Sequence, residues 1–203
     1  MTNFSELPYS AGLMSQSFWF VEFKAILHLI SDGKTDDEIK RISLNENLFG
    51  APNAYRTRRI CGYLLNRSKA IDDPLLQLFW NSDVEMQKVI NLIAILRGDR
   101  LFFEFVYEVY REKAYLDLPE LEMLDVNSFF TRKGQQSDVV EKWNDTTKKK
   151  LRGIYYNFLT DAGLLRRKNR SYLIKRVFLD DRLLYLLKKS DDLPLQKAIT
   201  GEM

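Results

Sequence analysis

The spacing of apolar residues predicts three helices in the first 70 residues. The first covers residues 18 to 31, where four apolar side chains lie close to a common face: Val21, Ile26, Leu27 and Ile30. The segment "TDDE", from Thr35 to Glu38, has the pattern of a capping box and begins a short second helix. A longer basic helix begins near Asn53. A helix, a short helix and a longer basic helix in this order predict a helix-turn-helix-like unit over residues 18 to 70.

The middle of the chain is expected to form a helical hairpin over residues 74 to 115. The segment "SDVE", from Ser82 to Glu85, is a second capping-box pattern, and the helix that follows it ends at Gly98. A further helix begins near Arg100 and carries large apolar side chains. The short link between the two helices predicts that they are antiparallel neighbours.

Pro119, in the segment "DLPE", marks a change of element and the expected domain boundary. Residues 1 to 118 are expected to form an N-terminal helical domain, and residues 119 to 192 a C-terminal winged-helix-like domain. Residues 193 to 203 are expected to be a flexible tail. The expected fold class is therefore all-α, mainly helical, with a helix-turn-helix-like bundle and a small β-hairpin wing.

The C-terminal domain is expected to combine two short helices, one amphipathic helix and the hairpin. The short helices, at 120 to 131 and 136 to 143, are separated by Gly134. The next helix begins at "NDTT" and ends at a glycine, and its apolar stripe has five members: Leu151, Ile154, Tyr155, Phe158 and Leu159. Two strands, at 164 to 167 and 172 to 178, complete the domain as the only sheet.

Positive charge is concentrated in the same C-terminal segment. The whole chain has a net charge of +3, whereas residues 145 to 176 contain ten Lys and Arg against two Asp, a local charge of +8. This segregation indicates a polyanionic partner, because cations that neutralise phosphates release counterions. The candidate nucleic-acid contacts on the helix and hairpin are Lys148, Lys149, Arg152, Tyr156, Arg166, Arg167, Lys168 and Arg170. A second candidate set lies on the third N-terminal helix: Arg56, Arg58 and Arg59.

Two of these residues have expected roles of their own. The planar guanidinium of Arg152 matches the two acceptors on the edge of a guanine. Tyr156 is expected to share the cationic side of the helix and to donate to a phosphate or pack on a sugar. The competing interpretation is that the basic helix face is only solvated surface, since exposed charges often contribute little.

Residues that would support catalysis or metal binding are few. The chain has one histidine, His28, and one cysteine, Cys61, which cannot complete a four-ligand zinc site. It contains no glycine-rich phosphate loop, nucleophile elbow or zincin motif, so we expect no enzymatic activity, cofactor or metal. The most apolar run, "VINLIAIL" at 89 to 96, is well short of the roughly 20 residues of a membrane span. We expect a cytoplasmic protein that is a monomer or a weak dimer.

Four segments carry a resemblance to a known family. They are "YSAGLMSQSFWFVEFKAILHLISDGKTDDEIKR", "ENLFGAPNAYRTRRICGYLLNR", "VINLIAILRGDRLFFEFVYEVYREK" and "WNDTTKKKLRGIYYNFLTDAGLL". Together they resemble the BrxA family, small accessory proteins of bacterial BREX phage-defence systems. The resemblance implies a helical protein with winged-helix character that binds DNA and acts beside a methyltransferase and other BREX components. It supplies no set of catalytic residues.

Two functions from different classes follow from these observations. One is a non-catalytic accessory protein that binds double-stranded DNA through the basic helix and the wing. The other is a protein-interaction or RNA-binding adaptor that uses the same basic face within a multi-protein defence complex. Binding to naked duplex that weakens with salt distinguishes the first from the second.

Overall fold

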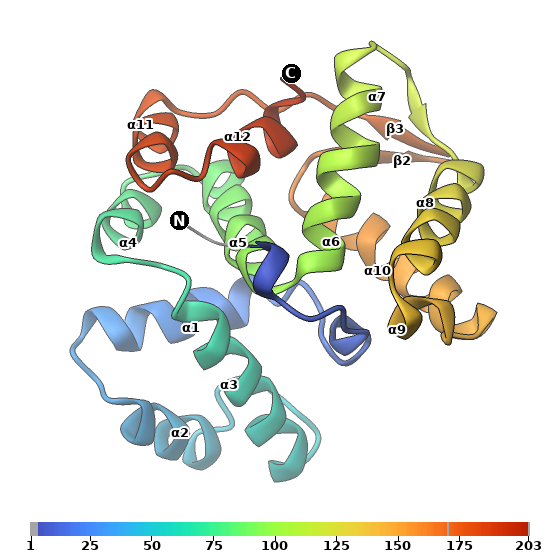
Figure 1. Ribbon diagram of the computed structural model, residues 1–203. Coiled ribbons are helices and arrows are strands. Elements are labelled where there is room, and N and C mark those ends of the chain that lie inside the picture. The colour runs from blue at the N-terminus through green and yellow to red at the C-terminus, as the bar shows by residue number, and fades with distance from the viewer. Residues whose placement is uncertain (1–3, 170, 203) are drawn as a thin grey trace.

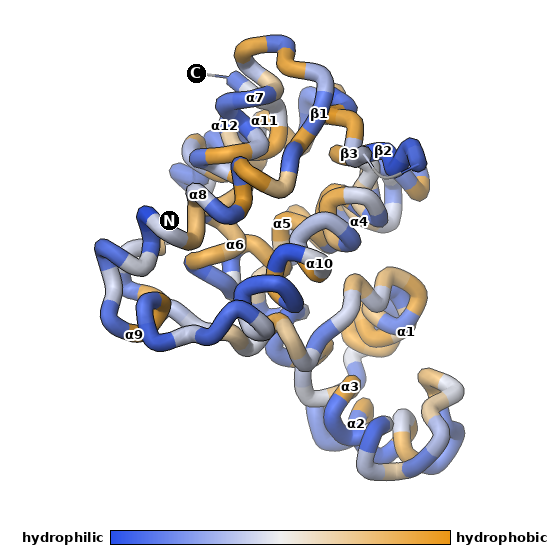
Figure 2. Tube along the Cα trace, turned by 90° about the vertical axis from the view of Figure 1, so that its right-hand side faces the viewer, coloured by the Kyte–Doolittle hydropathy of each residue, from blue (hydrophilic) through white to orange (hydrophobic). Residues whose placement is uncertain are grey.

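The computed structural model describes residues 4 to 169 and 171 to 202, and the expected mainly helical class is confirmed (Figure 1). The N-terminal part contains two short 3-10 turns and three helices. Their bounds are η1 Phe4–Glu6, η2 Gly12–Ser15, α1 Phe20–Ser31, α2 Asp36–Asn45 and α3 Ala54–Ser68. In both views α1, α2 and α3 lie together at one end of the molecule (Figures 1 and 2).

Local signals at the helix starts of this part are confirmed. The Thr35 hydroxyl accepts from the Glu38 amide, and the Glu38 carboxylate accepts from the Thr35 amide at 2.8 Å. The Asn53 side chain caps α3 by accepting from the Arg56 amide at 2.9 Å. Each bond satisfies a backbone N–H that the helix itself leaves without a partner. The inner side of α3 is buried: Ile60, Cys61, Leu64 and Leu65.

The middle part contains one helix more than expected and a π-helical turn. The bounds are α4 Asp73–Trp80, α5 Val84–Gly98, α6 Arg100–Phe105, the π turn η3 Val106–Tyr110 and α7 Arg111–Tyr115. The capping box expected at Ser82 is wrong, because Asp83 caps α5 by accepting from the Met86 amide at 2.8 Å. The Ser82 hydroxyl instead donates to the Leu78 carbonyl in the last turn of α4. The residue that caps a helix here depends on the helix before it.

The C-terminal part differs from expectation at its start. The bounds are β1 Glu120–Leu121, α8 Met123–Gln136, α9 Asp138–Glu141, α10 Asp145–Asp161, β2 Leu165–Lys168 and β3 Ser171–Ile174. Residues 120 and 121 form a strand, and Gly134 lies inside α8 and does not separate two helices. A Cβ on Gly134 would lie 3.6 Å from the Cα of Glu141, an ordinary van der Waals contact, so α8 and α9 pack closely at this position.

The sheet has three antiparallel strands in the order β1-β3-β2, so the expected hairpin gains a third strand. In the hairpin, Arg167 pairs with Tyr172, and on the other side of β3 Leu121 pairs with the same Tyr172. β3 ends at Ile174, earlier than expected. At the turn, Asn169 has a φ of 55°, a left-handed conformation that asparagine tolerates.

α10 packs its apolar stripe into the core. Leu151, Tyr155, Phe158 and Leu159 are buried as expected, and the fifth member of the stripe, Ile154, is partly buried. The Tyr155 ring lies 4.7 Å from Phe102 and 5.1 Å from Phe105, measured between centroids. One hydrophobic cluster therefore includes residues from both sides of Pro119.

The last part of the chain is helical and packed. Its helices are α11 Asp181–Lys189 and α12 Leu193–Thr200. Residues 193 to 203 are expected to be a flexible tail, but Leu195, Ala198 and Ile199 are buried against the π turn and α7. Gly201, with a φ of 77°, ends α12 where a Cβ would lie 2.8 Å from that of Ala114. The tail expectation is wrong because the apolar side of this short helix has a partner surface far away in sequence.

Within the described residues, no helix is both long and apolar enough to span a membrane.

Candidate nucleic-acid interface

The first half of α10 gathers like charges on one helix. The Asn144 side chain caps it by accepting from the Thr147 amide at 2.8 Å. Four cations follow within two turns: Lys148, Lys149, Lys150 and Arg152. Lys149 and Lys150 are exposed, and Lys148 and Arg152 are partly exposed. Like charges three and four residues apart destabilise a helix by about 0.2–0.5 kcal/mol per pair, so their clustering opposes the stability of the fold.

Arg152 forms a hydrogen bond with a neutral side chain. Its Nη1 donates to Oδ1 of Asn127, on α8, over 3.3 Å. No carboxylate of the described residues forms an ion pair with it. The guanidinium therefore keeps its charge uncompensated and most of its donors free for another acceptor.

Tyr156 does not lie on the cationic surface, and this expectation is wrong. Its side chain is 7% exposed, and its hydroxyl donates to the Glu122 carbonyl at 3.0 Å. The ring of Tyr172, on β3, lies 4.4 Å from the Tyr156 ring. Burial raises the pKa of the Tyr156 hydroxyl. The sheet covers this position of α10. Helical periodicity alone could not predict this burial, because the contact comes from a strand outside the helix.

The β2–β3 hairpin carries further exposed cations beside α10. Arg166, Arg167 and Lys168 are exposed, whereas Arg170 lies outside the described residues. Arg167 is the cross-strand partner of Tyr172, which packs on α10 one turn after Arg152. Figure 2 shows hydrophilic stretches at both the start of α10 and this hairpin.

The cations of this surface share a lack of acidic partners. In the described part of the chain, no carboxylate forms an ion pair with any of these residues: Lys148, Lys149, Lys150, Arg152, Arg166, Arg167, Lys168 and Lys175. Arg176 is different, because its Nη2 lies 2.7 Å from Oδ1 of Asp117. We call the eight residues the basic surface. A surface of uncompensated cations attracts phosphates.

The second candidate set lies on α3. Arg56, Arg58 and Arg59 are exposed and also form no ion pair with a described carboxylate. Arg56 and Arg59 border a cleft of about 530 Å³ that also contains Trp19 and Tyr55. The structure therefore does not bring the three α3 arginines into the basic surface. They form a separate cationic region.

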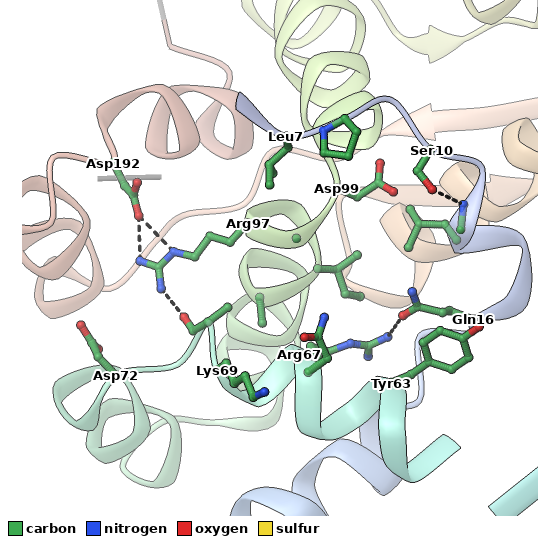
Figure 3. Close-up of a pocket in the computed structure, with 18 of the residues that line it drawn as sticks. Leu7, Ser10, Gln16, Tyr63, Arg67, Lys69, Asp72, Arg97, Asp99 and Asp192 are labelled. Atoms are coloured by element: carbon green, nitrogen blue, oxygen red, sulfur yellow. Dashed lines mark hydrogen bonds and ion pairs between the residues drawn. The ribbon is translucent and has the colours of Figure 1, made fainter. Parts of the chain in front are cut away.

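Another cleft, of about 810 Å³, is lined by both acidic and basic residues, and several of these hold elements of the fold together (Figure 3). Arg97 Nη2 lies 2.8 Å from Oδ2 of Asp192, which ties α5 to the start of α12. Arg67 is 5% exposed and donates to Gln16, Ser17, Phe18 and Asn91.

Arg67 lies on the buried side of α3, although a charged residue is usually exposed. Burial lowers its pKa to about 9. A signal was present, since Arg67 follows Leu64 by three residues and Ile60 by seven, which is the spacing of one helix face. It holds the segment before α1 in place.

No group of three or more potential metal ligands is found among the described residues. What the fold and surface define is a small, mainly helical protein with a three-stranded sheet and a cationic helix beside its hairpin. The BrxA family model matches residues 7 to 191, so the chain belongs to the BrxA family.

Two curated relatives agree with this assignment, and one solved structure shares the fold. "BREX protein BrxA" from Bacillus cereus (strain H3081.97) is 33% identical over 197 residues, which cover 97% of this chain and 98% of the relative. "BREX protein BrxA" from Paramagnetospirillum magneticum (strain ATCC 700264 / AMB-1) is 19% identical, with 93% and 94% covered. A crystal structure of an uncharacterized protein from Magnetospirillum magneticum superposes with a TM-score of 0.80 at 18% identity, covering 96% and 99% of the two chains. At that identity it shows the fold alone.

Proposed function

We propose that this protein binds double-stranded DNA through the basic surface, as a non-catalytic accessory component of a bacterial BREX phage-defence system. The observation that carries the proposal is that eight cations, on α10, on β2 and directly after β3, form no ion pair with a carboxylate among the described residues. Repulsion between clustered like charges lowers folding stability, and bound phosphates would neutralise these charges. The BREX context comes from the names of the relatives.

The order of elements supports a winged-helix mode of binding. The order α7, β1, α8, α9, α10, β2 and β3, with the sheet order β1-β3-β2, resembles that of a winged helix with the short α9 as an additional helix. In that fold the helix before the hairpin enters the major groove and the hairpin lies along the backbone. The groove is about 12 Å wide and admits an α-helix.

The composition of the basic surface favours weak sequence preference. Its exposed cations on α10 are mainly lysines, which contact phosphates as point charges. Arg152 is the planar group best placed on α10 for a guanine edge. We therefore propose that binding positions the protein on DNA and that other BREX components, including the methyltransferase, supply the chemistry.

The direct experiment is an electrophoretic shift titration at low salt with a duplex, its single strand and an RNA of the same sequence. We expect the duplex to shift, and Lys149→Ala with Arg152→Ala to weaken that shift. Lys188→Ala with Lys189→Ala is the matched control, because it removes two exposed cations from α11 instead. A shift confined to RNA would favour the adaptor function, and equal losses in both double variants would refute the assignment of the surface.

A further inference from the structure

A second cleft lies between the first turn of α3 and the segment that precedes α1. Its volume is about 530 Å³, and its walls include Trp19, Asn53, Tyr55, Arg56 and Arg59. Aromatic rings and guanidinium groups therefore meet at one opening. The basic surface contributes none of the residues that line this cleft.

Two aromatic side chains, Trp19 and Tyr55, line the cleft. Tyr55 is 67% exposed. The Trp19 ring is half-buried and stacks on Tyr63, with 6.1 Å between centroids and 28° between planes. The Arg59 guanidinium lies over Tyr55 and Tyr63, at 5.8 Å and 6.0 Å from their centroids. Cation and rings are thus held together on one side of α3.

Trp19 reaches the cleft through a strained backbone. Its φ of 45° and ψ of 48° are left-handed, a conformation that a bulky residue rarely adopts. The preceding backbone is fixed, because Arg67 Nη1 and Asn91 Nδ2 both donate to the Phe18 carbonyl, at 2.7 Å and 2.9 Å. A buried polar network therefore holds a strained aromatic residue at the edge of a cleft, a combination that is typical of binding sites.

Charge in and around the cleft is uncompensated. Arg56 and Arg59, which line it, and Arg58 between them are exposed, and none forms an ion pair with a carboxylate in the described part of the chain. A ligand that fits must offer flat aromatic groups to the rings and negative charge to the arginines. Nucleotides with unpaired bases offer both, whereas the bases of a duplex are already stacked on one another.

We propose that this cleft, centred on Trp19, Tyr55 and Arg59, binds single-stranded nucleic acid by stacking unpaired bases and pairing arginines with phosphates. Gln16 and Ser17 line both this cleft and a smaller one, of about 320 Å³, that contains Arg167. The single-strand site therefore adjoins the hairpin of the basic surface. It does not depend on duplex binding, so the two proposals can fail separately.

The test is fluorescence anisotropy of a labelled oligothymidine of about ten nucleotides, within the usual range of single-strand site sizes. Tyr55→Ala is expected to weaken its binding by about 5- to 100-fold, the loss of one stacked base, while Tyr55→Phe keeps the ring and the affinity. Tyr185→Ala is the matched control, because Tyr185 is 64% exposed on α11 and should bind no base. An oligouridine of equal length shows whether DNA or RNA is preferred, and tight binding of either supports the site.

Three results would overturn the proposal. They are no binding of either oligonucleotide by the wild-type protein, equal affinity of wild type and Tyr55→Ala, and an equal loss in Tyr185→Ala. The duplex affinity of the same variants distinguishes this site from the basic surface. Tyr55→Ala should leave the duplex affinity unchanged, and Lys149→Ala with Arg152→Ala should leave oligothymidine binding largely intact. A parallel loss of both ligands in Tyr55→Ala would place the cleft in the duplex surface and refute a separate single-strand site.

Discussion

Residues of one type have different roles in this protein according to burial. Arg67 is almost completely buried and donates to neutral oxygens of the N-terminal segment, so its charge serves the fold. Arg97 is partly buried and pairs with Asp192. Arg152 is partly exposed and Arg167 is exposed, and neither has a described carboxylate partner. The arginines proposed to bind nucleic acid are therefore recognised by their missing partners, which the sequence does not reveal.

Asp99 provides a prediction about pH. It caps α6 by accepting from the Phe102 amide at 2.9 Å, yet burial raises its pKa to about 6 despite the amides that stabilise its charge. The unfolded carboxyl titrates near the ordinary value of 3.8. Between these values the folded state binds more protons than the unfolded state, so this group lowers stability as pH rises from about 4 to about 6.

Asp99→Asn is therefore expected to raise the melting temperature at pH 7. Asparagine keeps the capping oxygen and removes the buried charge, and the gain should be about 2 to 6 °C. At pH 4 the two proteins should melt at nearly the same temperature, because Asp99 is then protonated in the folded state. Calorimetric melting at both pH values measures the difference, and a gain that is equal at pH 4 and pH 7 would contradict this role of burial.

At the scale of elements, α10 has a buried side that stabilises the fold and an exposed side that is proposed to bind DNA. Phe158 is 2% exposed and packs against Phe18 and Phe102, whereas Lys149 is exposed on the other side. Both sides share the same cap at Asn144. Substitutions on each side therefore compare a core role with a surface role within a single helix.

Phe158→Ala is expected to lower the free energy of unfolding by about 3 to 5 kcal/mol, because it removes a large ring from a packed core. Urea denaturation measures this loss. Lys149→Ala with Arg152→Ala should change the free energy of unfolding by less than about 1 kcal/mol, because exposed cations contribute little to stability. A double variant as unstable as Phe158→Ala would show that the cations of α10 support the fold.

Elements with strong local signals could be predicted from the sequence, and those with non-local partners could not. The caps at Thr35, Asn53 and Asn144 are formed by neighbouring residues, so the pattern was sufficient. Helical periodicity predicts Tyr156 on the cationic side of α10, but Tyr172 of strand β3 covers it. The basic surface was predicted by composition, but the cleft at Trp19 requires a left-handed residue and two distant segments.

At the scale of the whole molecule, the C-terminus completes the core of the earlier part of the chain. α12 lies against the π turn and α7, and Asp192 anchors its start through Arg97 (Figures 1 and 3). Leu195 and Ile199 are fully buried there. The last helix is therefore part of the fold although it is short.

Removing residues 193 to 203 is expected to lower the melting temperature by about 10 °C. Two fully buried aliphatic side chains contribute about 1.5 to 3 kcal/mol each, and about 1 kcal/mol corresponds to 2 to 4 °C at this size. Leu193→Ala serves as the control, because Leu193 is 41% exposed and should have little effect. An unchanged melting temperature in the truncated protein would contradict the packed position of α12.

The central claim is that the cations of α10 and the hairpin neutralise DNA phosphates, and the salt dependence of duplex affinity tests it most directly. If about five phosphates are neutralised, the slope of log affinity against log salt should be near −4 to −5 for the wild-type protein. Lys149→Ala with Arg152→Ala should make that slope shallower by about 2, one unit for each lost phosphate contact, without a change in melting temperature. A wild-type slope near zero, or an unchanged slope in the double variant, would contradict the account.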